Sequence, residues 1–581
     1  MEQERSKAEI GSVTNRTRDQ LANERTSLAR MPARIVSGGW GGRVAEGLKE
    51  GLTMPESRLG VPRSALIVGL ASVTLGVGLG RSGRLTYHEA FVAQGAREMI
   101  AGGDLVVPRV DGRPWLEKPP LAIWLVALAG RVAGGVSEAA ARAPSAVAAA
   151  LLALGVATLA ARRFDATVGL LAGLVQATSA WTVIRGRLAE ADMLLACLMT
   201  WTVVAFDRSR DEGPGRDRWR RAFFAGLGLT ALAKGIGFGA VLVGAVAAVV
   251  LAWDRDREGA RRLRSLEGWA LAAALALAWP ALVMSRLPRA FDLWTLHVAD
   301  RLAARPEHFT GGPWWQYGPA VLWQVLPWTP LALVGAWRSL ARAVHDRGGG
   351  DRLLWAWAVA PIALLSLATV KNAHYAIHAL PPWSVWTALC LARIGDRLRG
   401  RGCSSKGLRR IGVAVFGGLG LAFGVGFAVL GPRFDRRGME WAFYETVRRS
   451  LPPGEPLALL YDDWDRDPYP SPFGPFPHDL AVRLYYLDRP ACWRQGVEAL
   501  VGLPPGPGAS PFAVVGRERD LPALRRLGRV ETLARGPRGR ARASRVDDRT
   551  FLLFRVHPEA PRRPGEHEGV AGMGGAKISA N

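Results

Sequence analysis

The sequence predicts an all-α polytopic membrane protein with about eleven spans, followed by a small α/β domain. Of its 581 residues, 49% are hydrophobic, and they gather in blocks such as "AVLVGAVAAVVLAW" instead of being spread as in a soluble core. Blocks of about 20 residues match the thickness of a bilayer. Arg-rich segments separate the blocks, as is typical of loops on the cytoplasmic side of a membrane.

The net charge of +25 does not point to a nucleic-acid partner, because the arginines lie in short segments between apolar blocks. The four cysteines have no paired spacing, so we expect neither a disulfide framework nor a zinc knuckle. Residues 1–62 are polar and basic and lack the apolar core of a signal peptide, so we expect a disordered cytoplasmic tail there.

The Arg-rich segments define the topology. With the basic N-terminus inside, the first span leads outward, and the loop at 161–165 must be inside again. Only one of the two apolar segments between them can cross. Segment 119–135 is the shorter, carries Arg131 and is interrupted by glycines, so we expect it to be an interfacial or re-entrant helix. The predicted spans are 63–80, 143–160, 166–184, 190–206, 221–234, 237–253, 267–285, 319–337, 353–370, 374–392 and 411–430.

This topology places most of the charged and polar residues that end the spans on the outer face. They are His88, Glu89, Glu117, Lys118, Asp192, Lys234, His297, His308, Lys371 and Tyr375. Charged groups at the ends of spans are costly unless they are paired or hydrated. Their accumulation on one face therefore predicts a functional site.

The chain divides by composition into four parts. A transmembrane domain is expected over 63–431. Residues 432–560 alternate short β-type runs such as "TFLLFRV" with helical patterns, which predicts an α/β domain on the outer face. Residues 561–581 are rich in Pro and Gly, and we expect a disordered tail.

The stretch "HEAFVAQGAREMIAGGDLVVPRVDGRPWLEKPPL" resembles the first outer loop of GT-C glycosyltransferases that use polyprenyl-phosphate sugars. It is most similar to the lipid A aminoarabinose transferases and the dolichyl-phosphate-mannose protein mannosyltransferase family. Weaker similarity continues in "RGRLAEADMLL", "LTALAKGIGFG" and "TVKNAHYAIHALPPWSVWTAL". The family has an Asp where this chain has His88.

The resemblance implies an enzyme of the inner (plasma) membrane that transfers a sugar from an undecaprenyl- or dolichyl-type phosphate. The acceptor would be a hydroxyl or phosphate of lipid A, a protein or an envelope glycan, on the outer face. Two alternatives stay open. One is a flippase for lipid-linked sugars, and the other is a catalytically silent relative that binds glycans, because His88 replaces the family Asp.

Sugar transfer from a lipid phosphate needs cations that hold the departing phosphate and a base that takes the acceptor proton. The predicted catalytic residues are His88, Glu89 and Asp192. The predicted donor-phosphate ligands are Lys118, Arg109, Lys234, Arg301, Lys371 and Tyr375.

A divalent metal, zinc or magnesium, is a further expectation. Glu117, His297 and His308 supply the carboxylate and imidazole groups that suit zinc.

Overall fold

The computed structural model describes residues 62–558, apart from 214, 296–311, 347–348, 369–370, 436–437, 453–454, 462–471, 474–475, 477–479, 490, 501–510 and 539–549. Residues 1–61 of the predicted N-terminal tail and the whole predicted C-terminal tail at 561–581 lie outside this part of the chain.

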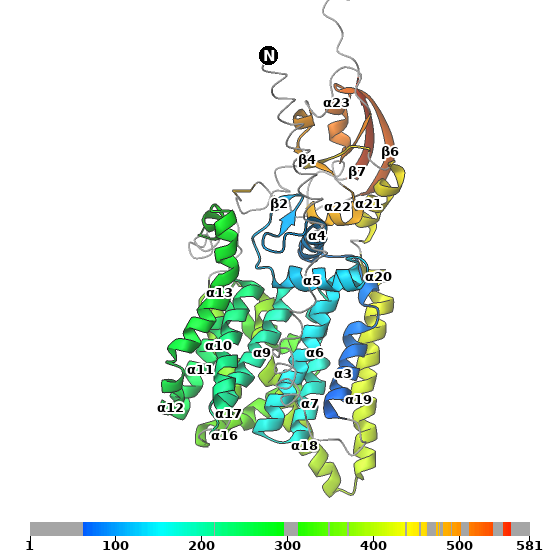
Figure 1. Ribbon diagram of the computed structural model, residues 1–581. Helices are drawn as coiled ribbons and strands as arrows, with labels where there is room; N and C mark the ends of the chain where they lie inside the picture. Colours follow the sequence, from blue (N-terminus) through cyan, green and yellow to red (C-terminus); the bar gives the residue numbers. More distant parts are fainter. Residues whose placement is uncertain are drawn as a thin grey trace, which may run out of the picture. The chain divides into compact units, whose positions relative to one another are not determined.

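Helices make up most of the described chain up to residue 434 (Figure 1). The first is α3 (Arg63–Ala71), which continues into a π-helical turn, η2 (Ser72–Gly76), and a 3-10 turn, η3 (Leu79–Arg81). The others are α4 (Tyr87–Gly102), α5 (Leu121–Val132), α6 (Glu138–Arg163), α7 (Ala166–Ala177), α8 (Ala180–Gly186), α9 (Ala191–Ser209), α10 (Arg216–Lys234), α11 (Phe238–Asp254), α12 (Arg257–Arg262), α13 (Leu266–Arg286), α15 (Tyr317–Gln324), α16 (Thr329–His345), α17 (Gly350–Leu367), η4 (Ala373–Ala379), α18 (Pro381–Gly400), α19 (Ser405–Val425), η5 (Gly426–Leu430) and α20 (Gly431–Phe434).

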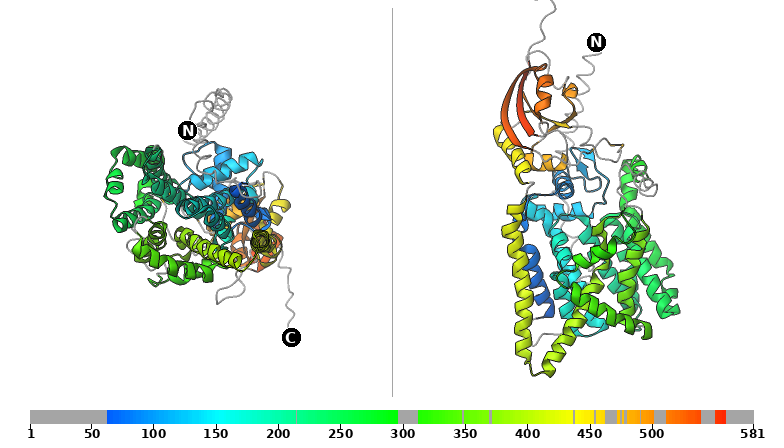
Figure 2. Two further views of the ribbon diagram at one scale, coloured as in Figure 1. Left: turned by 90° about the horizontal axis from the view of Figure 1, so that it is seen from below. Right: turned by 180° about the vertical axis from the view of Figure 1, so that it is seen from behind.

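Five helical segments of the described chain are long and apolar enough to cross a membrane, and the number rises to seven if each of two bent helix pairs is one span. The chain is therefore an integral membrane protein. The count of eleven stays a prediction. Figure 2 shows two of the long segments, α3 and α19, side by side.

The predicted span 319–337 is not one straight helix. In the structure α15 and α16 meet at a bend of 117°. Pro327 lies in the break, and Pro330 occupies the first turn of α16. Proline has no N–H to donate, so the chain ends one helix and begins another there although the apolar pattern continues through the bend.

The segment that was expected to be interfacial contains α5, a 12-residue helix, which is too short to cross a bilayer at 1.5 Å per residue. It packs against α4 and α6 and also contacts α9 and α10. Between α4 and α5 the chain forms a small antiparallel pair, β1 (Arg109–Val110) and β2 (Arg113–Pro114). The first loop thus lies over the ends of the helices (Figure 1).

Beyond residue 434 the chain forms a five-stranded sheet in the order β4-β3-β5-β7-β6. The strands are β3 (Leu457–Tyr461), β4 (Cys492–Gln495), β5 (Phe512–Arg517), β6 (Gly528–Arg538) and β7 (Thr550–Pro558), and the helices with them include α21 (Gly438–Ser450) and α22 (Leu480–Leu487). β3 runs parallel to β4 and β5, whereas β7 is antiparallel to β5 and β6. β5 is buried along its whole length, as expected of a central strand covered on both faces.

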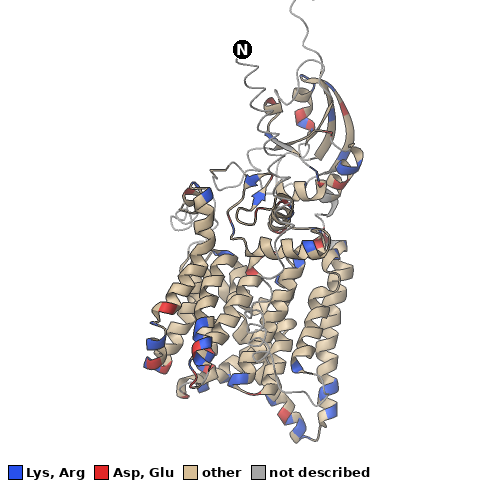
Figure 3. Ribbon diagram, viewed as in Figure 1, with Lys and Arg blue, Asp and Glu red and all other residues tan. Residues whose placement is uncertain are grey.

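Lys and Arg gather at one end of the helices, around α12 and the connection from α18 to α19 (Figure 3). We call this the arginine-rich end. Helices α9 and α10 are antiparallel neighbours, so the start of α9 and the end of α10 lie together at the opposite end.

Candidate active site

A cluster of charged side chains surrounds Asp192, in the first turn of α9. Its carboxylate is buried and forms an ion pair with Lys234, the last residue of α10. The other carboxylate oxygen accepts a hydrogen bond of 2.8 Å from Arg185 of α8 and lies 3.8 Å from the Nε2 atom of His374. Three separate segments of the chain therefore converge on one carboxylate.

Aromatic rings complete this cluster on the Lys234 side. The Lys234 ammonium lies 4.0 Å from the centre of the Tyr375 ring and 5.4 Å from that of Phe238. A cation over an aromatic face is attracted by the ring quadrupole. Lys234 is thus held by Asp192 and Tyr375, and its side chain is only 11% exposed.

Glu190 adds a titratable group at the edge of the cluster, in the connection between α8 and α9. It forms an ion pair with Arg185. Burial raises the pKa of Glu190 to about 7, because the lost hydration of its carboxylate outweighs the attraction of Arg185. Arg185 also forms an ion pair with Asp192. The charge of the cluster therefore changes near neutral pH.

His88 and Glu89 begin α4, and Glu89 takes part in a capping box. The Thr86 hydroxyl accepts a hydrogen bond from the Glu89 N–H, and the Glu89 carboxylate accepts one from the Thr86 N–H. This arrangement turns the Glu89 side chain inward, where it has no exposed surface, and leaves His88 exposed on the outer side of the first turn. His88 lies close enough to His374 for their charges to interact.

The Glu89 carboxylate is fully engaged by protein groups. It forms a buried ion pair of 2.8 Å with Arg142 of α6 and accepts a further hydrogen bond from the N–H of Ala189, besides the one from Thr86. Both oxygens thus serve to join α4, α6 and the segment that precedes α9. This geometry favours a positioning role for Glu89 over that of a proton acceptor.

Arg187, two residues after Arg185, likewise joins separate segments of the chain. Its buried guanidinium donates to the carbonyls of Thr74, Leu75 and Val77, where η2 interrupts the regular helix, and to the hydroxyl of Ser82. These bonds satisfy carbonyls that the irregular turn leaves without regular helical partners.

The remaining predicted ligands lie on other segments. Lys118 and Glu117 are half-buried just before α5, and among the described residues Lys118 has no ion-pair partner. Arg109 lies in β1, where it donates to the carbonyl of Gly112. Lys371 donates to the carbonyl of Ala368.

Arg301, His297 and His308 lie outside the described residues. Within the part of the chain that is described, no group of three or more His, Cys, Asp or Glu side chains is arranged to hold a metal ion. The metal site with Glu117 therefore stays a prediction.

The structure thus brings four of the predicted residues into one region: His88, Asp192, Lys234 and Tyr375. Arg185, Glu190 and His374 also belong to this region but were not among the predicted residues. All three stand within the short motifs that contain Asp192 and Tyr375, so charge within a few residues of a predicted site residue was the available signal.

Comparison with known proteins supports the resemblance seen in the sequence. The model of the dolichyl-phosphate-mannose-protein mannosyltransferase family matches residues 117–284. The undecaprenyl phosphate-alpha-4-amino-4-deoxy-L-arabinose arabinosyl transferase of Pseudomonas aeruginosa is 30% identical over 350 residues, which are 56% of this chain and 60% of that protein. The protein of the same name from Edwardsiella ictaluri is 30% identical over 340 residues, 56% and 58% of the two chains.

The fold is shared with a solved structure. ArnT from Cupriavidus metallidurans, bound to undecaprenyl phosphate, superposes with a TM-score of 0.66 at 20% identity, over 84% of this chain and 97% of that one. The same protein without ligand gives 0.67 at 21% identity. The chain spans about three fifths of the length of the curated relatives it matches. The chain is thus similar to GT-C polyprenyl-phosphate-sugar transferases in sequence and shares the fold of ArnT.

Proposed function

We propose that this protein is a membrane glycosyltransferase that moves a sugar from a polyprenyl phosphate to an acceptor hydroxyl or phosphate on lipid A, a protein or an envelope glycan. One observation carries the proposal. Segments whose sequences resemble such transferases meet in space, where Lys234 and Arg185 converge on Asp192 beside the exposed His88. The names of the relatives specify undecaprenyl phosphate and an arabinosyl group, which supports the donor class.

The charges of the cluster suit an anionic donor. Lys234 and Arg185 carry two positive charges, and Asp192 cancels one of them. When Glu190 is protonated, one positive charge remains, and it attracts the phosphate that departs from the sugar. Lys118, half-buried just before α5, would add a second contact to the lipid phosphate.

His88 is the residue we assign to the acceptor. It lies exposed on the first turn of α4, and its ring contacts that of Tyr87 in a tilted arrangement, with 3.9 Å between centroids. A neutral imidazole takes a proton from a hydroxyl near physiological pH. Glu89 would act through its neighbours, since its four polar contacts fix the first turn of α4 and therefore the place of His88.

The orientation follows from charge. Arginines gather at the end of the helices opposite Asp192 (Figure 3). By the positive-inside rule this end is cytoplasmic, and we propose the same side for the basic N-terminal segment because of its charge. The site and residues 432–560 would then face the periplasm from the inner membrane.

The direct test uses the full-length protein in proteoliposomes with a labelled undecaprenyl-phosphate-linked sugar and candidate acceptors. Transfer should fall at least tenfold in Lys118→Ala and be unaffected in Arg261→Gln, a control at the arginine-rich end. His88→Ala should abolish transfer, whereas His88→Asp should retain it, because a carboxylate also accepts a proton.

Two outcomes would overturn the proposal. Movement of the labelled lipid across the bilayer without transfer to any acceptor would identify a flippase. Binding of glycans with neither transfer nor movement would identify a silent relative.

A further inference from the structure

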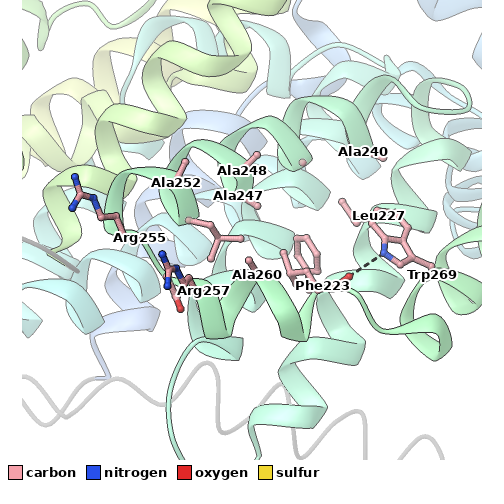
Figure 4. A pocket seen from close by; sticks show the side chains of 14 residues that line it. Phe223, Leu227, Ala240, Ala247, Ala248, Ala252, Arg255, Arg257, Ala260 and Trp269 are labelled. Carbon is pink, nitrogen blue, oxygen red and sulfur yellow. Dashed lines mark hydrogen bonds between the residues drawn. The ribbon is translucent and has the colours of Figure 1, made fainter.

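A groove lies between α10, α11 and α13, away from the cluster around Asp192. It has a volume of about 680 Å³. Small residues of α11, among them Gly244, Ala248 and Ala252, form one wall, and Phe223 and Leu227 of α10 contribute to the other (Figure 4). Such a lining makes van der Waals contact with a hydrocarbon chain and offers it no hydrogen-bonding group.

The groove ends at exposed positive charge. Arg255 and Arg257 line it at the arginine-rich end, and among the described residues neither guanidinium has an ion-pair partner (Figure 4). The three acidic residues beside them pair with other arginines. Asp256 accepts hydrogen bonds from Arg210 at 2.9 Å and from the N–H of Gly259 at 2.7 Å. Asp254 forms ion pairs with Arg210 and Arg352, and Glu258 forms one with Arg262. An apolar groove with a basic mouth is complementary to an anionic lipid.

The backbone at Arg255 supports a role for its side chain. Arg255 ends α11 with a φ of 56°, in the left-handed region. Glycine is the usual residue at this position, because a side chain there is strained. An arginine kept in a strained conformation at the mouth of a groove points to a function for the guanidinium.

The groove is longer than the hydrocarbon layer of one leaflet is thick. It extends from Ala240 to Arg255 along α11, which is about 22 Å at 1.5 Å per residue. Half of the hydrocarbon thickness of a bilayer is about 15 Å. One acyl chain that enters beside Arg255 can therefore stay in contact with the groove through its own leaflet.

We propose that this groove binds an anionic glycerophospholipid, with one acyl chain along α11 and the phosphate at Arg255 and Arg257. The site is separate from the proposed donor site, because it opens at the opposite end of α11. It needs no assumption about the reaction.

The test measures lipids retained by the purified full-length protein in native mass spectrometry, after equilibration with phosphatidylglycerol or phosphatidylcholine of identical acyl chains. The protein should retain phosphatidylglycerol preferentially. Arg255→Gly should lower this retention about fivefold, and Arg255→Gly with Arg257→Gln about thirtyfold. Arg261→Gln is the matched control, because Arg261 is exposed on α12 but does not line the groove.

Folding is not at risk in these variants. Glycine relieves the strain at position 255, so Arg255→Gly should unfold at the same temperature or a higher one. A second variant tests the chain-binding part. A Cβ atom at Gly244 would meet nothing within 4 Å, and Gly244 lines the groove, so Gly244→Leu places a side chain in it and should lower the retention of both lipids.

Equal retention of the two lipids by the wild type would overturn the proposal. Retention of phosphatidylglycerol that is unchanged in both the Arg255 and Gly244 variants would also overturn it. Displacement of phosphatidylglycerol by an equal amount of undecaprenyl phosphate would assign the groove to the donor lipid instead.

Discussion

Glu89→Gln separates a positioning role from a chemical one. The carboxylate of Glu89 and the guanidinium of Arg142 are 0% and 2% exposed and 2.8 Å apart. Removal of one partner of a buried ion pair leaves the other charge without compensation, which costs about 3–5 kcal/mol. Because Glu89 also accepts hydrogen bonds from Thr86 and Ala189, we expect Glu89→Gln to lower the free energy of unfolding by at least about 3 kcal/mol.

A double-mutant cycle makes this expectation specific. Arg142→Met alone should cost about as much as Glu89→Gln, and it also removes hydrogen bonds to the carbonyls of Leu79 and Arg84. The double variant has no uncompensated charge. It should therefore lose only about 2–3 kcal/mol, which implies a coupling energy of about 3 kcal/mol or more between the two residues.

The assay is equilibrium unfolding in mixed micelles, combined with sugar transfer by the same preparations. If Glu89 only positions α4, the double variant should transfer sugar faster than Glu89→Gln, because α4 returns to its place. Additive losses of stability would refute the coupling. Wild-type stability together with abolished transfer in Glu89→Gln would show that the carboxylate acts on the substrate.

Three further predictions concern the charged cluster and its support. Undecaprenyl phosphate should bind Glu190→Gln about as tightly as the wild type at pH 6 and about tenfold more tightly at pH 8, because Glu190, with its pKa of about 7, is ionised at pH 8. One charge about 10 Å away contributes about 1.7 kcal/mol at an effective dielectric constant near 20. A ratio of the two dissociation constants that does not change with pH would contradict this prediction. Lys234→Met should raise the dissociation constant of the same lipid about 10- to 100-fold, as expected for the loss of a charged hydrogen-bond donor. Lys234→Arg should restore most of the affinity. An unchanged dissociation constant in Lys234→Met would show that Lys234 does not belong to the donor site. Arg187→Met should lower the free energy of unfolding by about 4 kcal/mol, about 1 kcal/mol for each lost hydrogen bond, and a loss below about 1 kcal/mol in micelle unfolding would show that water replaces those bonds.

Hydropathy predicted the long helices well because a bilayer constrains length and composition together. The predicted span 267–285 corresponds to α13, Leu266–Arg286, within one residue at each end. The bend between α15 and α16 was missed, since apolar residues continue through Pro327 and only the loss of an N–H marks the break.

Some members of the charged cluster were among the predicted residues, but their pairing was not predicted. Charge at the ends of spans indicated Asp192 and Lys234, which form an ion pair although they are far apart in sequence. The partner of Glu89 was not predictable, because Arg142 stands within an alanine-rich helix 53 residues away and its position resembles that of an ordinary basic residue near a helix start. A sequence pattern identifies residues whose burial costs free energy, but only the fold shows which of them form ion pairs with each other.

Buried arginines occur at both ends of the helices, and at the end that carries Asp192 they explain how a site can form. At the arginine-rich end, Arg255 and Arg257 are exposed, whereas Arg352 is buried and donates to the carbonyls of Ala343 and Trp253. At the opposite end Arg142 and Arg187 are buried and donate to the carbonyls of η2, η3 and the turns that follow them. Irregular backbone is tolerated beside a membrane only where protein groups satisfy it. Irregular backbone in turn lets short segments bring Asp192 and His88 to the same surface, which regular helices alone would not do.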